Sequence, residues 1–339
     1  MRAMISTAPM ALALLGGCAT MPITGGPAVT VVASGQTEPV GTANQDAADD
    51  PAIWRNAADP AASLIVATDK KAGLYVYGLD GAVKSFDAAG RLNNVDLVEL
   101  ADGSVLVASS KRDDPVNSEV VLHRLNTTTG TLEALGTVSS GPGEGYGLCL
   151  SQHDGLSVFA VIKDGRIREY ALSLTQSTPA AMLVRELSVP SQAEGCVVDE
   201  REGTLYVGEE AGGIWRFADG ATTGDLVVPI DNDALVADVE GLAIAPAGAT
   251  GGYVVASSQG DNAYALFRLP DLTFAGRFRI GAGAFGATEE TDGIDLALGS
   301  FGGDYPQGLF VAQDGQNAPA AQNFKLVSWG AVLNALGLE

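Results

Sequence analysis

Histidine and basic residues are scarce in this chain of 339 residues, and both shortages narrow its function. Only two histidines occur, His123 and His153, so little histidine-based chemistry is available. Lysine and arginine total 19 against 41 acidic residues, which gives a net charge of −22. Nucleic acids and anionic lipid surfaces are bound through basic patches, so this excess of acid argues against both partners. It suits divalent cations, although acidic residues that only keep an exported protein soluble would give the same count.

The apolar stretch near the N-terminus, residues 5–15, is too short to span a bilayer but has the length of a signal-peptide core. The small residues before Cys18 resemble a bacterial lipobox, in which the cysteine becomes the acylated first residue of the mature protein. We therefore expect a lipoprotein signal peptide at residues 1–18, lipidation at Cys18 and a flexible tether at residues 19–28. An ordinary signal peptide is the alternative, and both export the protein. Because Ala19 follows the cysteine, a lipoprotein would face the periplasm from the outer membrane.

Glycine and proline are abundant, at 43 and 15 residues, which indicates many turns and few long helices. A repeat of 44 to 52 residues occurs six times, each copy carrying two or three short runs of β-branched and aromatic residues. Such repeats are typical of β-propeller blades. The sequence thus predicts an all-β, six-bladed propeller that forms a single domain over residues 29–339. We expect residues 29–32 to close the last blade as its outer strand and residues 329–338 to form a short C-terminal helix.

Polar residues stand at equivalent places in the six repeats, and equivalent places in a propeller lie on a circle around one axis. The first strands begin at Asp50, Asn94, Tyr146, Glu194, Glu240 and Asp292. Carboxylates this close raise one another's pKa unless a cation is present. Calcium fits, because it takes six to eight oxygen ligands and needs neither cysteine nor histidine.

The ends of the second strands form another ring, in which the first three repeats supply cations and the last three supply oxygen ligands. Its members are Lys70, Arg112, Lys163, Glu210, Gln259 and Asp314. A polyanionic substrate that spans a metal-binding half and an anion-binding half is the simplest use of this pattern. Any single member is better explained as a turn former, so the prediction rests on the agreement of the six repeats in position and their sorting by charge. Cys149 and Cys196 also occupy similar places in successive repeats, and both a disulfide and two buried thiols remain open.

Several segments resemble those of β-propeller (alkaline) phytases in order and in spacing. They are residues 46–54, 91–96, 191–195, 238–242, 256–260, 290–295 and 308–315. The resemblance implies a 3-phytase type phosphomonoester hydrolase that releases phosphate from phytate, myo-inositol hexakisphosphate, with several calcium ions. A metal-activated water would attack phosphorus without a covalent enzyme intermediate. The implied partner is phytate or its calcium salt. From the lipobox we expect membrane contact only through the N-terminal lipid anchor, and we expect a monomer.

The resemblance also implies roles for individual residues. The catalytic residues would be Asp50, Glu194, Glu210, Asp292 and Tyr146. The phosphate groups would be bound by Lys70, Arg112, Tyr146 and Lys163. The calcium ligands would be Asp49, Asp50, Asn93, Asn94, Asp96, Glu194, Glu210, Asp238, Glu240, Gln259, Asp292 and Asp314. Lys111, Arg166 and Arg168 depart from the pattern of the relatives and would add cations near the phosphate-binding half.

Two other functions remain open at this stage. A calcium-dependent propeller lactonase or sugar-acid hydrolase would not need the cations Lys70, Arg112 and Lys163. A lipid-anchored binding propeller would have no catalysis at all. No Arg-His-Gly-x-Arg segment occurs, and neither Cys149 nor Cys196 has an arginine six positions later, so histidine acid phosphatases and cysteine phosphatases are excluded.

Overall fold

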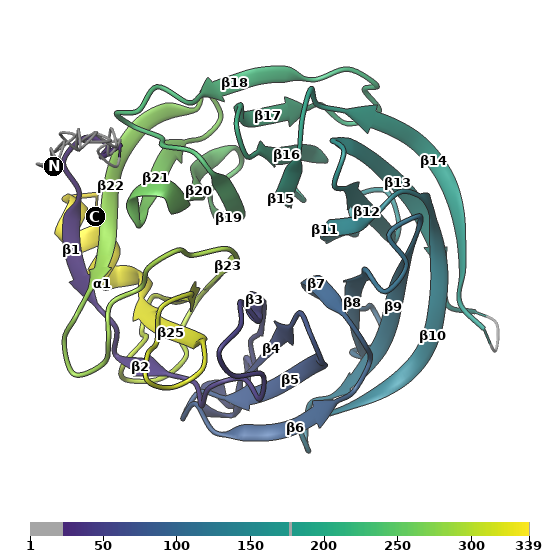
Figure 1. Cartoon of the computed structure of the whole chain (residues 1–339), viewed down its shortest axis with the longest axis horizontal. Coiled ribbons are helices and arrows are strands. Elements are labelled where there is room, and N and C mark those ends of the chain that lie inside the picture. The colour runs from purple at the N-terminus through teal and green to yellow at the C-terminus, as the bar shows by residue number, and fades with distance from the viewer. Residues whose placement is uncertain (1–22, 176–177, 339) are drawn as a thin grey trace, which may run out of the picture.

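The computed structural model describes residues 23–175 and 178–338, and these form six β-sheets arranged as blades around a central channel (Figure 1). The fold prediction of a six-bladed β-propeller is therefore confirmed. The predicted signal peptide and Cys18 lie outside the described residues. None of the helices in the described part of the chain is long and apolar enough to cross a membrane.

Apart from the two strands of the N-terminal segment, the strands within each blade are antiparallel and follow chain order from the channel outward. The first blade holds β3 (Ala48–Trp54), β4 (Leu64–Asp69), β5 (Gly73–Gly78) and β6 (Val83–Asp87). The second holds β7 (Leu92–Glu99), β8 (Val105–Lys111), β9 (Asn117–Asn126) and β10 (Thr131–Pro142). The third holds β11 (Gly145–Ser151), β12 (Ser157–Ile162), β13 (Arg166–Ser173) and β14 (Ala180–Ser188). The fourth holds β15 (Ala193–Asp199), β16 (Thr204–Glu209), β17 (Gly213–Phe217) and β18 (Asp225–Pro229). The fifth holds β19 (Val239–Ala247), β20 (Gly251–Ser258), β21 (Ala263–Arg268) and β22 (Thr273–Gly281). The last holds β23 (Ile294–Leu298), β24 (Gly308–Asp314) and β25 (Asn323–Ser328).

Apolar side chains form the core between the blades rather than at the channel. Each of six buried clusters joins two neighbouring blades, as where Val66 of the first blade packs with Val95 and Val107 of the second. Because the blades on either side cover both faces of each sheet, the middle strands are buried along their length, as in Leu64–Asp69. The channel side is left to the polar starts of the inner strands.

The N-terminal segment closes the ring, but residues 29–32 do not form the outer strand of the last blade, which is the position that the sequence predicted for them. β1 (Val29–Val32) pairs in parallel with β22 and becomes a fifth strand of the fifth blade. The last blade is completed instead by the short β2 (Gly35–Gln36), which pairs with β25. Both outer strands would otherwise expose unpaired backbone groups, and the N-terminal chain covers the two free edges one after the other.

Two residues of the segment 19–28, which was predicted to be a flexible tether, are hydrogen-bonded to the body of the protein. The Gly25 amide donates to Asp261 Oδ2 at 3.0 Å, and the Gly26 amide donates to the carbonyl of Asp233 at 2.8 Å. These bonds hold the end of the segment against the fifth blade, next to the 3-10 helix η2 (Gln259–Asp261). A second 3-10 helix, η1 (Pro60–Ala62), precedes β4.

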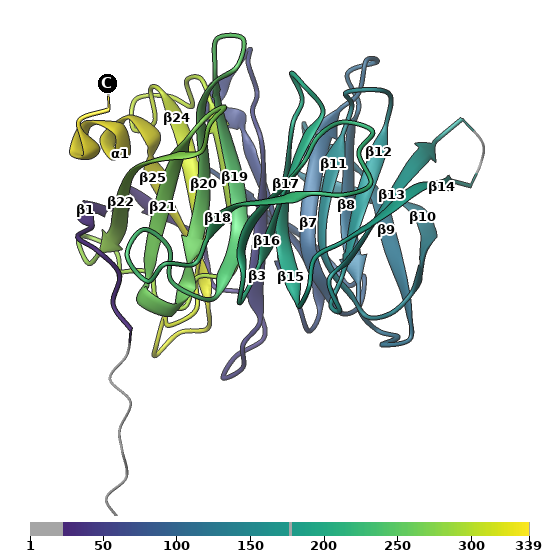
Figure 2. The same cartoon turned by 90° about the horizontal axis from the view of Figure 1, so that it is seen from above.

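The predicted C-terminal helix is confirmed as α1 (Trp329–Leu336), which buries Trp329 and Val332 and ends at Gly337 in the left-handed conformation. It follows β25 and lies at the end of the ring opposite the starts of the inner strands (Figure 2). Between the third and fourth blades, Cys149 of β11 and Cys196 of β15 form a disulfide, with their Cα atoms 5.7 Å apart. The structure thus decides between the two alternatives that the sequence left open.

Candidate active site

The inner strands bring their polar residues to the channel through β-bulges. Five of these strands have a register shift near the start, and the sixth, β23, begins just after Asp292. A bulge adds one residue to one strand and redirects the side chains around it. The bulges contain Asp50, Asn94, Tyr146, Glu194 and Glu240. The ring predicted from the six repeats therefore lies at one mouth of the channel.

Glycines let these strands approach closely enough for their acids to meet. Glycine follows the polar residue in four repeats, and a Cβ on Gly195 would lie only 2.2 Å from the carbonyl oxygen of Glu240. A Cβ on Gly293 would lie 2.5 Å from the Cα of Asp50. No side chain fits at such distances, so glycine is required where one inner strand touches the next.

Three glutamates from two blades converge at this mouth. Glu194, Glu210 and Glu240 can each place a carboxylate oxygen within 4.8 Å of the others, and Glu194 and Glu240 are buried. Burial and the charges of Glu194 and Asp292 hold the pKa of Glu240 well above its usual range. Burial and the charge of Asp49 raise the pKa of Glu194. The protein side chains by themselves therefore leave these glutamates short of positive charge.

Two carboxylate oxygens at the site have no hydrogen-bond partner among the described residues. These are Glu240 Oε2 and Asp49 Oδ2, and both are buried. An unpaired buried carboxylate oxygen is costly, and a bound cation would supply the missing partner. The donor set consists of oxygens without sulfur or imidazole, which fits calcium or magnesium.

Lys70 lies among carboxylates, although the sequence assigned it to the half of the ring that supplies cations. Its Nζ is 2.8 Å from Asp49 Oδ1, 2.8 Å from Asp292 Oδ2 and 2.9 Å from Asp46 Oδ2. Burial lowers the pKa of this lysine, but the three carboxylates outweigh it and the pKa lies above its usual value. Lys70 was predicted to bind phosphate together with Arg112 and Lys163, and in the structure its long side chain also reaches the carboxylates of the other half. Asp292 also accepts a hydrogen bond from Gln259 Nε2 at 2.5 Å.

Arg112, Lys163 and Tyr146 lie together on the other side of the mouth, as predicted. The Arg112 guanidinium carbon and Lys163 Nζ are 5.4 and 5.0 Å from the centre of the Tyr146 ring. Burial and the neighbouring glutamates raise the pKa of Tyr146, so its hydroxyl stays protonated and can donate a hydrogen bond. Arg112 is oriented by Glu144, at 2.7 Å, and by the side-chain oxygen of Asn93.

Two amides connect this cationic side to the glutamates. Asn93 donates to Glu194 Oε1 at 2.6 Å. Gln192 donates to Glu210 Oε1 at 2.6 Å and to the Tyr146 hydroxyl at 3.2 Å. Sequence reasoning missed Gln192 as a site residue, although it lies in one of the segments that carry the family resemblance.

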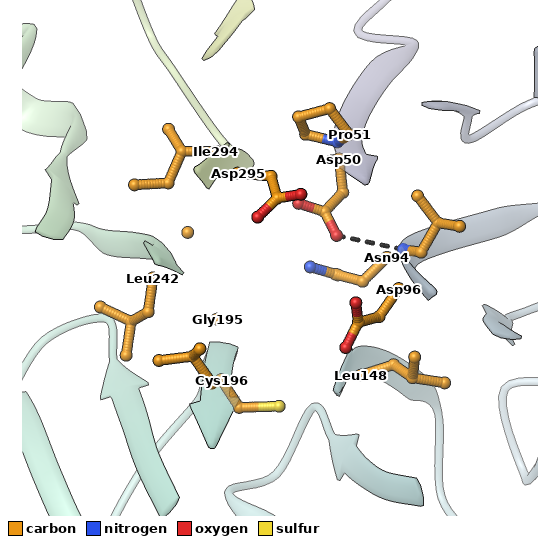
Figure 3. A pocket seen from close by; sticks show the side chains of 13 residues that line it. Asp50, Pro51, Asn94, Asp96, Leu148, Gly195, Cys196, Leu242, Ile294 and Asp295 are labelled. Atoms are coloured by element: carbon orange, nitrogen blue, oxygen red, sulfur yellow. Dashed lines mark hydrogen bonds between the residues drawn. The ribbon is translucent and has the colours of Figure 1, made fainter. Parts of the chain in front are cut away.

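A second group of acids lies farther along the inner strands, around a small cavity of about 50 Å³ (Figure 3). Asp50, Asn94, Asp96 and Asp295 point into this space (Figure 3). Burial raises the pKa of Asp96 to about 7 and that of Asp295 to about 6, and it raises the pKa of Asp50. Asp295 was not among the predicted site residues, although the segment 290–295 contains it.

The same acids bind neighbouring blades together. Asp50 accepts the amide of Val95 at 3.0 Å, and Asp96 accepts the amide of Leu150 at 2.7 Å. Asp295 likewise accepts a backbone amide of β3, at 2.8 Å. Each bond crosses from one inner strand to the next, so these carboxylates have a structural role beside any metal they hold.

Four other residues that the sequence singled out have different surroundings in the structure. Asp238 is exposed at the mouth. Burial raises the pKa of Glu210, the hydrogen bond from Gln192 lowers it, and the charge of Asp238 raises it further. Asp314 is buried and paired with Lys325 rather than with the mouth. The expectation that Arg168 adds a free cation is wrong, because its buried guanidinium donates to Glu186 at 2.6 Å and to two backbone carbonyls. Arg166 is paired with its neighbour Asp164.

A propeller whose mouth joins buried carboxylates to an arginine, a lysine and a protonated tyrosine defines an enzyme for an anionic substrate. Sequence comparison gives the particular family. The family model for phytase matches residues 3–339. A 3-phytase of Bacillus subtilis (strain 168) is 36% identical over an alignment of 328 residues, and the match covers 91% of this chain and 85% of the relative. The chain belongs to the phytase family, and its activity is the release of phosphate from phytate.

Comparison of folds supports the architecture alone. A chain in a crystal structure of the mitotic checkpoint complex superposes with a TM-score of 0.51 at 13% identity, covering 96% of this chain and 86% of that one. Such low identity carries no information on activity. The family match replaces the lactonase and the non-catalytic binding propeller as alternatives.

Proposed function

We propose that this phytase depends on calcium held by Glu194, Glu210 and Glu240 together with Asp49 and Asp292. The observation that carries the proposal is the meeting of three glutamates within 4.8 Å, next to buried carboxylate oxygens without partners. Calcium takes six to eight oxygen ligands in loose geometry, as this site offers. When bound, it would neutralise phosphate oxygens and lower the pKa of a coordinated water.

Further ions would use the other oxygens of the channel. The proposed additional ligands are Asp50, Asn93, Asn94, Asp96, Asp238 and Gln259. Raised pKa values at Asp50 and Asp96 support this, because a cation would favour the ionised form that burial disfavours.

The cationic side of the mouth binds the substrate's phosphates in this proposal. Lys163 makes no ion pair with any described residue, so its ammonium is available to a phosphate. The Arg112 guanidinium is held in place by Glu144 and offers a planar fork that matches phosphate oxygens. Tyr146 donates its hydroxyl proton to a phosphate oxygen. Binding of phosphates away from the reacting one orients the substrate for attack.

Lys70 has a double role in the proposal. Its ammonium holds Asp49 and Asp292 in place, and it borders the space that a phosphate on the calcium would enter. By analogy with the 3-phytase relative, the first phosphate removed is that at the 3-position.

Phosphate release from phytate tests the proposal directly. Activity with calcium should be lost in excess chelator and restored by added calcium. Glu210→Gln and Asp50→Asn should each lower the rate about 100-fold or more, the usual cost of losing a group that stabilises developing charge. Asp219→Asn is the control: it belongs to an exposed group with His153 and Asp154 at the opposite end of the ring, and should leave the rate unchanged. Full activity in chelator, or in both site variants, would refute calcium-dependent catalysis.

We also propose that the protein is exported and acylated at Cys18, and that it acts as a monomer at the periplasmic face of the outer membrane. The support is the sequence alone. Mass spectrometry of the mature N-terminal peptide should find a diacylglycerol-modified cysteine, and Cys18→Ser should move the enzyme from the membrane fraction to the soluble fraction. A soluble wild-type enzyme with an unmodified N-terminus would contradict lipidation.

A further inference from the structure

One lysine is completely buried in the last blade, and it makes no contact with the glutamates of the mouth. The side chain of Lys325, on β25, is 0% exposed, and its Nζ lies 2.8 Å from Asp314 Oδ2. Two amide oxygens complete its surroundings, Asn323 Oδ1 at 2.8 Å and Asn317 Oδ1 at 3.3 Å. An ammonium group has three donors, and three oxygens receive them here. This arrangement offsets the large cost of burying a charge.

The two amide oxygens are aimed at the ammonium by bonds on the other side of each amide. Asn323 Nδ2 donates to the carbonyl of Thr37 at 3.0 Å, and Asn317 Nδ2 donates to the carbonyl of Ala321 at 2.8 Å. With its nitrogen engaged, each amide can only turn its oxygen toward Lys325. The lysine therefore lies in a cage of oriented oxygens.

The carboxylate in this cage is fully used as well. Asp314 Oδ2 receives Lys325, while Asp314 Oδ1 accepts the backbone amides of Gln316 at 3.1 Å and Glu289 at 3.3 Å. Asp314 is 1% exposed, so it does not share this charge with solvent. The hydrogen bonds and the ion pair of Asp314 thus join the last blade to the segment that leads into it, and none of them goes to the glutamates of the mouth.

The cage fastens parts of the chain that border the active site. Thr37 follows β2, Asn323 begins β25, and Asn317 lies in the loop between β24 and β25. That loop lines a cavity of about 920 Å³ that also contains Asp292 and Gln259. A cation at this position therefore stabilises one wall of the catalytic mouth.

We propose that the ammonium of Lys325 occupies a place that a metal ion would otherwise take, so that Asp314 is not a calcium ligand of this enzyme. The distances of 2.8 to 3.3 Å are those of N–H···O hydrogen bonds, and calcium would need its oxygens at about 2.3–2.6 Å. One carboxylate and two amide oxygens are ligands that calcium accepts. The cage is thus a latent calcium site, kept filled by a cation that the chain itself supplies.

Calcium content and melting temperature of the purified protein test this inference without any measurement of catalysis. Lys325→Met should bind one more calcium ion per chain than the wild type, and its melting temperature should rise more on addition of calcium. Asp314→Asn keeps the lysine, so it should bind as many ions as the wild type and melt lower in calcium and in chelator alike. The double variant Lys325→Met/Asp314→Leu should lose the extra ion.

Two results would overturn the inference. One is an Asp314→Asn protein that binds one calcium ion fewer than the wild type, since Asp314 would then be a ligand. The other is a folded Lys325→Met protein with no additional ion. If Lys325→Met does not fold, the count for Asp314→Asn still decides. A wild type without any bound calcium would defeat the proposed catalytic role of calcium, but an ion gained by Lys325→Met would still support the latent site.

Discussion

Replacing Glu240 with glutamine should stabilise the metal-free enzyme and at the same time remove much of the stabilisation that calcium gives. Glu240 lies within 4.8 Å of the oxygens of Glu194 and Glu210. Two charges at that distance repel by about 3.5 kcal/mol at an effective dielectric constant of about 20. Burial and the charges of Glu194 and Asp292 raise the pKa of Glu240, so a rise in pH increases this repulsion by ionising the group. A net gain of about 2–3 kcal/mol is expected from glutamine, which has the same shape and no charge.

The gain converts to a measurable temperature shift. An unfolding entropy of about 2.1 cal/mol/K per residue gives roughly 0.7 kcal/mol/K for a chain of this length. Glu240→Gln should therefore melt about 3–4 °C higher than the wild type in chelator. In calcium the order should reverse, because the variant has lost one charged ligand. Calorimetry at pH 8.5, where the glutamates of the wild type are most ionised, measures both shifts.

Asp219→Asn is the matched control, because it also neutralises one acid of a three-residue group, but an exposed one. It should change neither melting temperature by more than about 1 °C. The reasoning fails if Glu240→Gln melts lower than the wild type in chelator, since Glu240 would then be an ordinary stabilising acid. It also fails if calcium raises the melting temperatures of variant and wild type equally.

Three further predictions concern other parts of the ring. The interblade disulfide closes a loop of 47 residues, so Cys149→Ala should cost about 4 kcal/mol of stability, seen as a lower melting temperature that reductant no longer changes. Folding raises the pKa values of Asp96 and Asp295 to about 7 and 6. In chelator, the protein should therefore lose stability as pH rises from about 4 to 7, by up to about 1.4 kcal/mol per pH unit for each group. A melting temperature in chelator that is flat or rises over this range would contradict the burial argument. Lys163→Ala should lower kcat/KM for phytate about 10- to 100-fold, mainly through KM. The control, Arg166→Ala, should have the wild-type value in steady-state assays. Equal values for both variants would show that Lys163 does not bind a phosphate of the substrate.

The sequence by itself determined the architecture and most of the active site. Six repeats of similar length give six similar blades, and a closed ring of blades places equivalent residues at equal distances from one axis. That symmetry is the reason why Glu194 and Glu240, 46 residues apart in the chain, could be predicted to meet. The glycine that follows the polar residue in four of the six repeats has the same explanation, because it permits the contact between inner strands.

Only the tertiary structure decided the features that do not follow the repeat. The N-terminal chain lies against the fifth blade first, so β1 pairs with β22 and only the following β2 reaches β25. The repeat pattern does not contain this information. The partners of long side chains are equally nonrepeating. Lys70 extends into the carboxylates and Lys325 fills its own oxygen cage, because each ammonium goes to the nearest buried oxygens, whose positions depend on loops that differ between blades.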